Sequence, residues 1–351
     1  MNPDVRIKRA MMRDVPDKVP LWCPLSLEHI INQGGPGGEV PETVEEYISI
    51  ECGLSKRYRF DGALLMFPAL RKNADMKSIL EQLLYQLPAG SKDHDFSKAD
   101  PEGWPPPVYD YTGEDFYSSR LAREIVGERI HLGGWIPDGF SKAIQWFPTL
   151  EEAFMAIKLD PGRFQTIVAY FDEWCIASVR AQIESGKMES IQISSPYAGS
   201  GFISPGDYKR FVLPSVTKIA KAIRTAGAFS YVHTCGHISD RLELITQSET
   251  DGIECLDPPP IGNVELKDAR TRVGNKIFLK GNIDSVNVLL RGSVEQIESA
   301  VRDCLSVGME GGGYILSTAC SVAPRVPAER VQLLADLIDR YGVYKTNNHS
   351  G

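Results

Sequence analysis

The chain of 351 residues carries 38 Lys and Arg against 46 Asp and Glu, and its net charge is -8 at neutral pH. This balance argues against a nucleic-acid partner or an anionic membrane surface, since both select for clustered positive charge. Residues 1–20 contain no apolar signal core, and no stretch approaches the about 18 apolar residues that a membrane span needs. Seven scattered cysteines do not form a secreted disulfide framework. We therefore expect a cytoplasmic globular protein in which some cysteines bind metal or take part in catalysis.

The first three predicted strands lie at 19–25 (VPLWCPL), 62–67 (GALLMF) and 130–135 (IHLGGW). Between the second and third of them, residues from about 88–120 are rich in proline and aromatic side chains and lack a regular apolar period. A long irregular segment in a compact fold is often a lid that faces the substrate, and the alternative is a surface loop whose rings cover exposed core. A helical pattern follows at about 164–186.

From residue 190 onward, short apolar runs alternate with amphipathic helical patterns. Five further strands are predicted at 190–195, 229–235, 252–257, 276–283 and 313–318, and helices at about 205–226, 240–249, 264–273, 293–307 and 327–341. Strands that alternate with helices through short links imply a parallel sheet with right-handed crossovers. Eight such strands predict an α/β protein with a single (β/α)8-barrel (TIM-barrel) domain over 1–351 and an insertion at about 88–120 in its N-terminal half.

A candidate metal site is formed by residues at predicted strand ends. His233 and Cys235 end one strand, and Cys320 follows the last one. Because side chains alternate along a strand, residues i and i+2 point the same way, so the imidazole and the thiol converge. The carboxyl ends of barrel strands meet at one mouth, where active sites are built. Two thiolates and an imidazole with an open fourth position form a catalytic type of zinc site. The alternative is that all three are ordinary buried core residues.

Further candidates lie at the same predicted mouth. Glu254, on the next strand, is the candidate for the fourth zinc position, and its alternative role is to hydrogen-bond a metal ligand. The neighbouring Cys255 is expected to face the opposite way, because side chains alternate. Asn282 and Asp284 either take part in catalysis by contacting the substrate or cap the next helix, and Tyr197 is a candidate substrate contact.

Five short motifs in the C-terminal half belong together: FISP at 202–205, HTCG at 233–236, GNID at 281–284, GGYIL at 312–316 and CSVAP at 320–324. In this combination the sequence resembles the uroporphyrinogen decarboxylase superfamily, and within it the zinc-dependent, corrinoid-linked methyltransferases. The resemblance covers somewhat under half of the chain, and the N-terminal half matches only in outline. It implies that His233, Cys235 and Cys320 bind the catalytic zinc.

The alternative within this superfamily is a tetrapyrrole decarboxylase. Those enzymes carry an arginine-rich segment after the first strand, which binds the carboxylates of the tetrapyrrole, and an aspartate after the second strand. The corresponding residues 22–28 (WCPLSLE) contain no arginine, and 64–69 (LLMFPA) are apolar. The resemblance therefore favours the methyltransferase branch, with Trp22 as a second candidate substrate contact. A barrel with a structural zinc and a binding role is the third possibility.

The resemblance implies methyl transfer between a corrinoid and a small thiol or a methoxylated molecule. Zinc would deprotonate a bound thiol in one direction, and in the other it would act as a Lewis acid on an ether oxygen. The aromatic segment at about 88–120 favours an apolar or aromatic methyl donor. The sequence shows no cobalamin-binding motif of the Asp-x-His-x-x-Gly type, so cobalamin is expected on a partner corrinoid protein.

Overall fold

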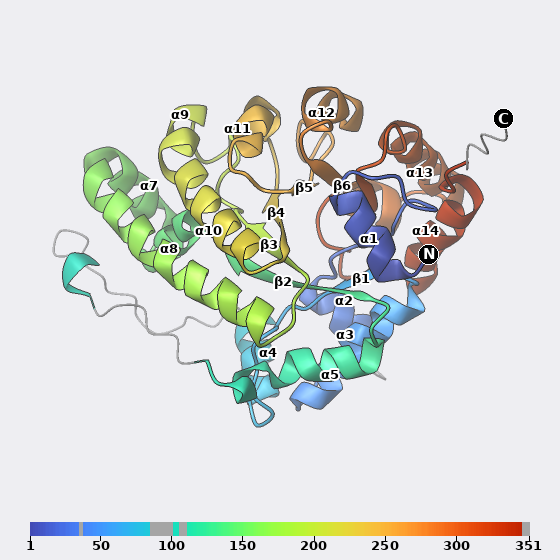
Figure 1. The fold of residues 1–351 in the computed structure, drawn as a ribbon, viewed down its shortest axis with the longest axis horizontal. Helices are drawn as coiled ribbons and strands as arrows, with labels where there is room; N and C mark the ends of the chain where they lie inside the picture. Colours follow the sequence, from blue (N-terminus) through green and yellow to red (C-terminus); the bar gives the residue numbers. More distant parts are fainter. Residues whose placement is uncertain (35–37, 85–100, 105–110, 346–351) are drawn as a thin grey trace.

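The computed structural model describes residues 1–34, 38–84, 101–104 and 111–345, and at its centre lies a seven-stranded parallel sheet (Figure 1). Its strands, in the same order in the sequence and in the sheet, are β1 (Gly62–Leu64), β2 (His131–Pro137), β3 (Ser190–Ser194), β4 (Phe229–Thr234), β5 (Gly252–Cys255), β6 (Phe278–Ile283) and β7 (Tyr314–Thr318). Each strand pairs in parallel with its neighbours in the sequence. This arrangement confirms an α/β fold that resembles a TIM barrel.

Helices surround the sheet on the outside, as Figure 1 shows. They are α1 (Pro3–Met11), α2 (Leu27–Gly34), α3 (Val44–Arg57), α4 (Met76–Leu84), α5 (Tyr117–Val126), α6 (Gly139–Trp146), α7 (Leu150–Leu159), α8 (Pro161–Glu184), α9 (Pro205–Asp207), α10 (Leu213–Thr225), α11 (Leu242–Thr246), α12 (Leu266–Val273), α13 (Val294–Gly308) and α14 (Ala328–Tyr341). The helices predicted after residue 190 are all present. Within the described residues, every helix is too short or too polar to cross a lipid bilayer.

The segment predicted as a strand at 19–25 is not a regular strand, but it lies in the place of one. Leu21 forms a parallel bridge with Leu316 of β7, and the amide of Trp22 donates to the Leu316 carbonyl at 3.0 Å. On its other side, the carbonyl of Leu21 accepts from the amide of Asp61, directly before β1, at 2.8 Å. Two prolines within the segment lack the N–H groups that a regular strand would donate. The segment therefore bridges β7 and the start of β1.

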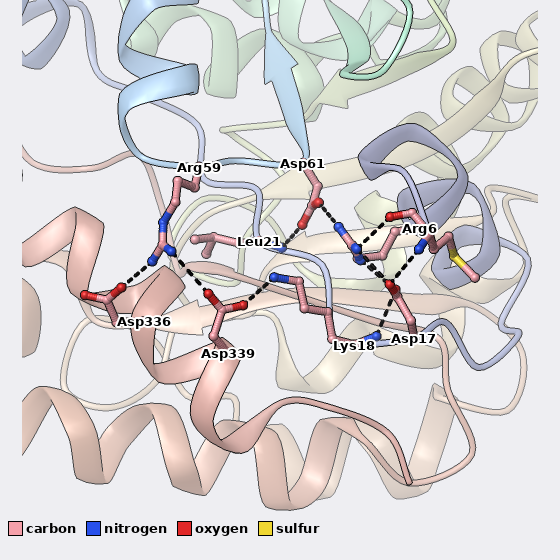
Figure 2. A network of polar contacts seen from close by, with 9 residues as sticks. Arg6, Asp17, Lys18, Leu21, Arg59, Asp61, Asp336 and Asp339 are labelled. Atoms are coloured by element: carbon pink, nitrogen blue, oxygen red, sulfur yellow. Dashed lines mark hydrogen bonds and ion pairs between the residues drawn. The ribbon is translucent and has the colours of Figure 1, made fainter. Parts of the chain in front are cut away.

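A buried polar network fixes this segment at the amino ends of the strands (Figure 2). The guanidinium of Arg6 in α1 contacts Asp61 at 2.5 Å and binds both carboxylate oxygens of Asp17, at 2.7 and 2.8 Å. The second oxygen of Asp61 accepts from the amide of Leu21 at 2.8 Å. Helix α1 and the segment after it are thereby tied to the beginning of the sheet, and the opposite, carboxyl end is left for a site.

Most of the predicted insertion at about 88–120 lies outside the described residues, and the insertion itself stays a prediction. Its described part departs from the expectation at one point, because α5 begins at Tyr117 and continues as a regular helix. Trp104 packs its ring against those of Trp146 and Tyr170, at centroid distances of 5.5 and 4.9 Å. For this side chain the contacts favour the alternative interpretation, in which rings cover exposed core.

Candidate metal centre

Four potential metal ligands meet at the carboxyl ends of three strands. His233 lies in β4, Cys235 directly after it, Cys255 ends β5, and Cys320 follows β7. One ligand atom from each residue lies within 4.8 Å of the corresponding atoms of the other three. Nε2 of His233 is 3.2 Å from Sγ of Cys235, which is 3.6 Å from Sγ of Cys320. The structure thus brings together the three residues that the sequence predicts as zinc ligands.

The spacing of these atoms fits a zinc ion. A tetrahedral zinc with metal–sulfur bonds of about 2.3 Å holds its sulfurs roughly 3.8 Å apart. The Cys235–Cys320 and Cys235–Cys255 sulfur pairs here measure 3.6 and 3.8 Å. Thiolates and imidazole are also the donors that zinc prefers. Hydrogen bonds from Cys235 and Cys255 lower the pKa of the Cys320 thiol, which favours the thiolate. Against a hydrogen bond from Cys255, the contact with Cys320 and burial raise the pKa of Cys235, and burial raises that of Cys255, so binding of a metal would release protons from these two thiols.

Glu254 lies on the other side of the His233 ring. Its Oε2 is 3.0 Å from Nδ1 of His233, and Gln192 and Lys280 also donate to this carboxylate. Burial raises the pKa of Glu254, but Lys280 and His233 outweigh it and lower that pKa to about 2. An ionised carboxylate that accepts the proton on Nδ1 leaves Nε2 free to bind metal. This position supports the alternative role for Glu254, a hydrogen-bonding partner behind the ligand.

Glu254 pairs with Lys280, and the ammonium group of Lys280 packs against two buried aromatic rings. The Lys280 ammonium sits 4.0 Å from the centroid of the Trp22 ring and 5.1 Å from that of Tyr231. Burial lowers the pKa of Lys280, whereas Glu254 opposes that shift. Trp22 is fully buried, so its position does not support the predicted substrate contact. Its ring instead forms a cation–π contact with the Lys280 ammonium.

The expectation for Cys255 was wrong, because the strand ends at this residue. Cys255 and Leu256 adopt φ angles of +85° and +56°, in the left-handed region, so alternation no longer governs where their side chains point. Asn282 donates to the carbonyl of Leu256 at 2.9 Å and thereby holds the turn. A glycine beside it is required, since a Cβ at Gly281 would lie 2.6 Å from the carbonyl oxygen of Cys255. The turn aims the Cys255 thiol at the other sulfurs.

Two other predicted site residues, Asp284 and Tyr197, make contacts outside the cluster of four potential ligands. Asp284 accepts from the amides of Val286 and Asn287, at 2.9 and 2.8 Å, so it caps the helical turn η7 (Ser285–Leu290) as the alternative interpretation expected. Tyr197 is partly buried and packs its ring against Phe202 at 5.7 Å. It is not among the described residues that line the cavity beside His233.

Three residues of the site were missed from the sequence. Gln192 and Lys280 are polar residues inside apolar strand runs, and that contrast was the available signal. Asp257 accepts from the amide of Gly236 at 2.6 Å and fixes the turn after Cys235. Burial raises the pKa of Asp257. Its position two residues past the β5 strand was the only hint in the sequence.

A cavity of about 460 Å³ opens beside His233. Its wall is mainly apolar and includes Leu64, Met66, Phe67 and Trp135. A second cavity of about 300 Å³ shares the last three of these residues and continues along the sheet. These volumes suit a small molecule. Of the four potential ligands, His233 lines this cavity, so an apolar molecule can approach it there away from bulk water.

Residues 2–341 match the family model described as uroporphyrinogen decarboxylase (URO-D). The chain belongs to this family. A solved structure described as a methyltransferase from Methanosarcina mazei superposes with a TM-score of 0.77, at 18% identity, over 97% of this chain and 99% of that one. At this identity the likeness concerns the fold alone. It agrees with the parallel sheet and surrounding helices described above.

Curated URO-D family relatives include both methyltransferases and decarboxylases. The methylated-thiol–coenzyme M methyltransferase of Methanosarcina mazei is 28% identical over 50% of this chain and 44% of its own length. The methylcobamide:CoM methyltransferase MtbA of Methanosarcina acetivorans is 26% identical over 63% of this chain and 62% of its own length. The chain thus matches less than two thirds of either methyltransferase. The uroporphyrinogen decarboxylase of Pseudoalteromonas atlantica is 26% identical over 96% of both proteins.

Proposed function

We propose that this URO-D family member is a zinc-dependent methyltransferase that moves a methyl group between a corrinoid carrier and a small thiol or methoxylated molecule. The observation that carries the proposal is the convergence of His233, Cys235 and Cys320 at the carboxyl end of the sheet. These three residues would hold the zinc. When bound, the ion makes a coordinated thiol a thiolate or polarises the heteroatom that gives up its methyl group.

The chain's own residues prepare the site for that chemistry. Glu254 accepts a hydrogen bond from Nδ1 of His233 and so turns Nε2 toward the sulfurs. Lys280 pairs with Glu254 and keeps this carboxylate ionised. The buried pair therefore fixes both the orientation and the tautomer of the imidazole before any substrate arrives.

The cavity supports a substrate with an apolar or aromatic body. Met66, Phe67 and Trp135 form its wall, and Trp135 is itself held by a hydrogen bond of 2.7 Å to the carbonyl of Met66. We further propose that cobalamin takes part and arrives on a separate corrinoid protein; the name of the relative from Methanosarcina acetivorans supports the first half of this proposal by naming a methylcobamide. Because this chain is acidic, such a partner would dock through shape and local complementarity.

The second candidate is a tetrapyrrole decarboxylase, which the relative from Pseudoalteromonas atlantica favours by matching 96% of the chain. Its substrate carries many carboxylates and needs cationic side chains. Among the described residues that line the cavity beside His233, none is Lys or Arg, whereas Glu28 is present. Such a wall would repel a multiply anionic substrate, so the methyltransferase is preferred.

Zinc analysis and a methyl-transfer assay test the proposal. We expect about one zinc per chain in the wild type, and loss of the metal in Cys235→Ala and Cys320→Ala. The fold should persist in both variants, because a barrel core does not depend on a site at its mouth. The control is Cys52→Ala in α3, a buried cysteine away from the cluster that should keep its zinc.

Demethylation of methylcobalamin in the presence of a thiol, followed in the visible spectrum, reports activity. His233→Ala should abolish it. Full zinc retention in both cysteine variants would overturn the assignment of Cys235 and Cys320 as ligands. Equal turnover by wild type and His233→Ala would remove zinc from the mechanism. Decarboxylation of a porphyrinogen by the wild type would favour the second candidate.

A further inference from the structure

We propose that Cys255 is a fourth ligand of the zinc, so that the resting centre holds three thiolates and one imidazole. This inference rests on the proposed zinc site and deepens it. The sequence motif accounts for only one imidazole and two thiols and leaves the fourth position open. The structure fills that position from the end of β5.

The distances between Sγ of Cys255 and the other potential ligand atoms are the first argument. Sγ of Cys255 lies 3.8 Å from Sγ of Cys235 and within 4.8 Å of the ligand atoms of His233 and Cys320. A tetrahedral zinc with bonds of about 2.3 Å to sulfur requires sulfur–sulfur separations of roughly 3.8 Å. The third sulfur, as the fourth ligand atom, is therefore placed where the tetrahedron needs it, and no backbone movement is required to bring it there.

The backbone conformation at Cys255 is the second argument. A regular strand would point Cys255 away from His233 and toward the surrounding helices, but φ of +85° turns the thiol back to the cluster. Left-handed backbone is strained for a non-glycine residue, and such strain gathers at functional sites. Three neighbouring features hold it here: the left-handed Leu256, the Asn282 hydrogen bond to the Leu256 carbonyl, and the close approach of the Cys255 carbonyl to Gly281, which has no Cβ to block it.

Burial indicates the part that Cys255 would take in the centre. Its side chain is fully buried, whereas Cys235 and Cys320 are partly exposed and His233 lines the cavity. Substrate reaches the centre from the side of these three residues. Cys255 thus anchors the ion from behind, and a substrate atom must enter the coordination shell by adding to it or by replacing one of the exposed ligands.

The competing interpretation is that Cys255 remains a neutral thiol that donates a hydrogen bond to Cys235. X-ray absorption at the zinc edge separates the two, because it counts sulfur atoms around the metal. For the full chain with one equivalent of zinc, we expect three sulfurs and one nitrogen. In Cys255→Ala the count should fall to two sulfurs, with a light atom in the vacated position.

Zinc affinity, measured by competition with a chromogenic chelator, gives a second readout. Cys255→Ala should bind zinc at least about tenfold more weakly than wild type, since even replacing a residue that only hydrogen-bonds a metal ligand typically costs ~10–100-fold in affinity. Cys304→Ala is the matched control, since Cys304 is also a buried cysteine and contacts Asn282 at 3.6 Å without joining the cluster. It should retain three sulfurs and the wild-type affinity.

Two sulfurs in the wild type, or an unchanged count in Cys255→Ala, would overturn the inference. The wild-type count needs no variant, so a folding defect in Cys255→Ala does not obscure the result. Zinc bound by two sulfurs together with active methyl transfer would refute the Cys255 assignment alone. Three sulfurs without methyl transfer would support the assignment and count against the proposed function.

Discussion

At the residue scale, the buried ion pair of Glu254 and Lys280 links the metal centre to the interior of the sheet. Both side chains are completely buried, and Lys280 rests on the rings of Trp22 and Tyr231. Removing one partner of a buried pair leaves an uncompensated charge in a poorly solvating interior. The pair is therefore expected to matter for stability as well as for the orientation of His233.

We predict that Lys280→Met lowers the free energy of unfolding by about 3–5 kcal/mol, because Glu254 then remains buried without its ammonium partner. Adding Glu254→Gln should recover most of this loss, since no buried charge is left. Urea denaturation of the metal-free single and double variants measures the coupling between the two sites.

A surface pair provides the control for this double-mutant cycle. Lys221 and Glu249 lie 3.1 Å apart with side chains 58% and 43% exposed, so Lys221→Met should cost less than about 1 kcal/mol. Strictly additive losses for Lys280→Met and Glu254→Gln would contradict the predicted coupling.

The sequence was enough to predict that His233, Cys235 and Cys320 converge, because strand alternation and the common mouth of parallel strands bring such residues together. It failed for Cys255, where alternation ends with the strand and the left-handed backbone is not readable from residue types. The sequence also did not predict the role of Lys280. A lysine within an apolar run does not indicate which carboxylate, here Glu254 on the neighbouring strand, will neutralise it.

At the element scale, the junction between β2 and α6 depends on Asp138, the N-cap of the helix. Its side chain accepts from the amide of Ser141 at 2.6 Å and from the hydroxyl of Ser195 at 2.5 Å. Burial raises the pKa of Asp138 from its ordinary 3.8 to about 6, although these hydrogen bonds oppose the shift. Between these two values the folded protein holds a proton that the unfolded chain has released.

The free energy of unfolding should therefore decrease as the pH rises from about 4 to about 6, because ionisation of Asp138 is easier in the unfolded chain. Asp138→Asn keeps a capping oxygen but cannot ionise, so this part of the decrease should disappear. Urea unfolding of wild type and variant at pH 4, 5, 6 and 7 measures the difference. Parallel pH profiles of the two proteins would refute the assignment to Asp138.

Strands and helices after residue 190 were predicted well because their apolar periods are regular and their ends carry caps, such as Ser293 with Gln296 before α13. The helices of the N-terminal half were harder to predict from the sequence. Helix α3 was not predicted, although its capping box of Thr43 and Glu46 is present in the sequence. Helix α5 was hidden because it directly follows a segment rich in proline and aromatic residues.

At the scale of the whole molecule, Arg6 connects α1, the segment at 19–25 and the start of β1 (Figure 2). Its guanidinium is mostly buried, and Asp17 and Asp61 raise its pKa against the effect of burial. Arg59 makes a superficially similar pair of contacts with Asp336 and Asp339 of α14, but its side chain is 48% exposed. The two arginines allow a direct comparison of buried and exposed ion pairs.

We expect Arg6→Ala to lower the free energy of unfolding by about 3–5 kcal/mol, because Asp61 is then buried without its partner. Arg59→Ala should cost no more than about 1 kcal/mol, since its pairs are solvated. Thermal and urea unfolding of both variants test this contrast. Equal losses would show that the network in the interior does not fix the segment at 19–25.

During synthesis, the segment at 19–25 leaves the ribosome roughly 300 residues before its partner strand β7. At about 5–20 residues per second, an interval of about 15–60 s separates the two events. In that time Val19, Leu21 and Trp22, which the finished protein buries, lack β7 as a partner. The nascent chain thus offers chaperones an apolar binding segment for tens of seconds, and the metal centre is equally late, since its last ligand is Cys320.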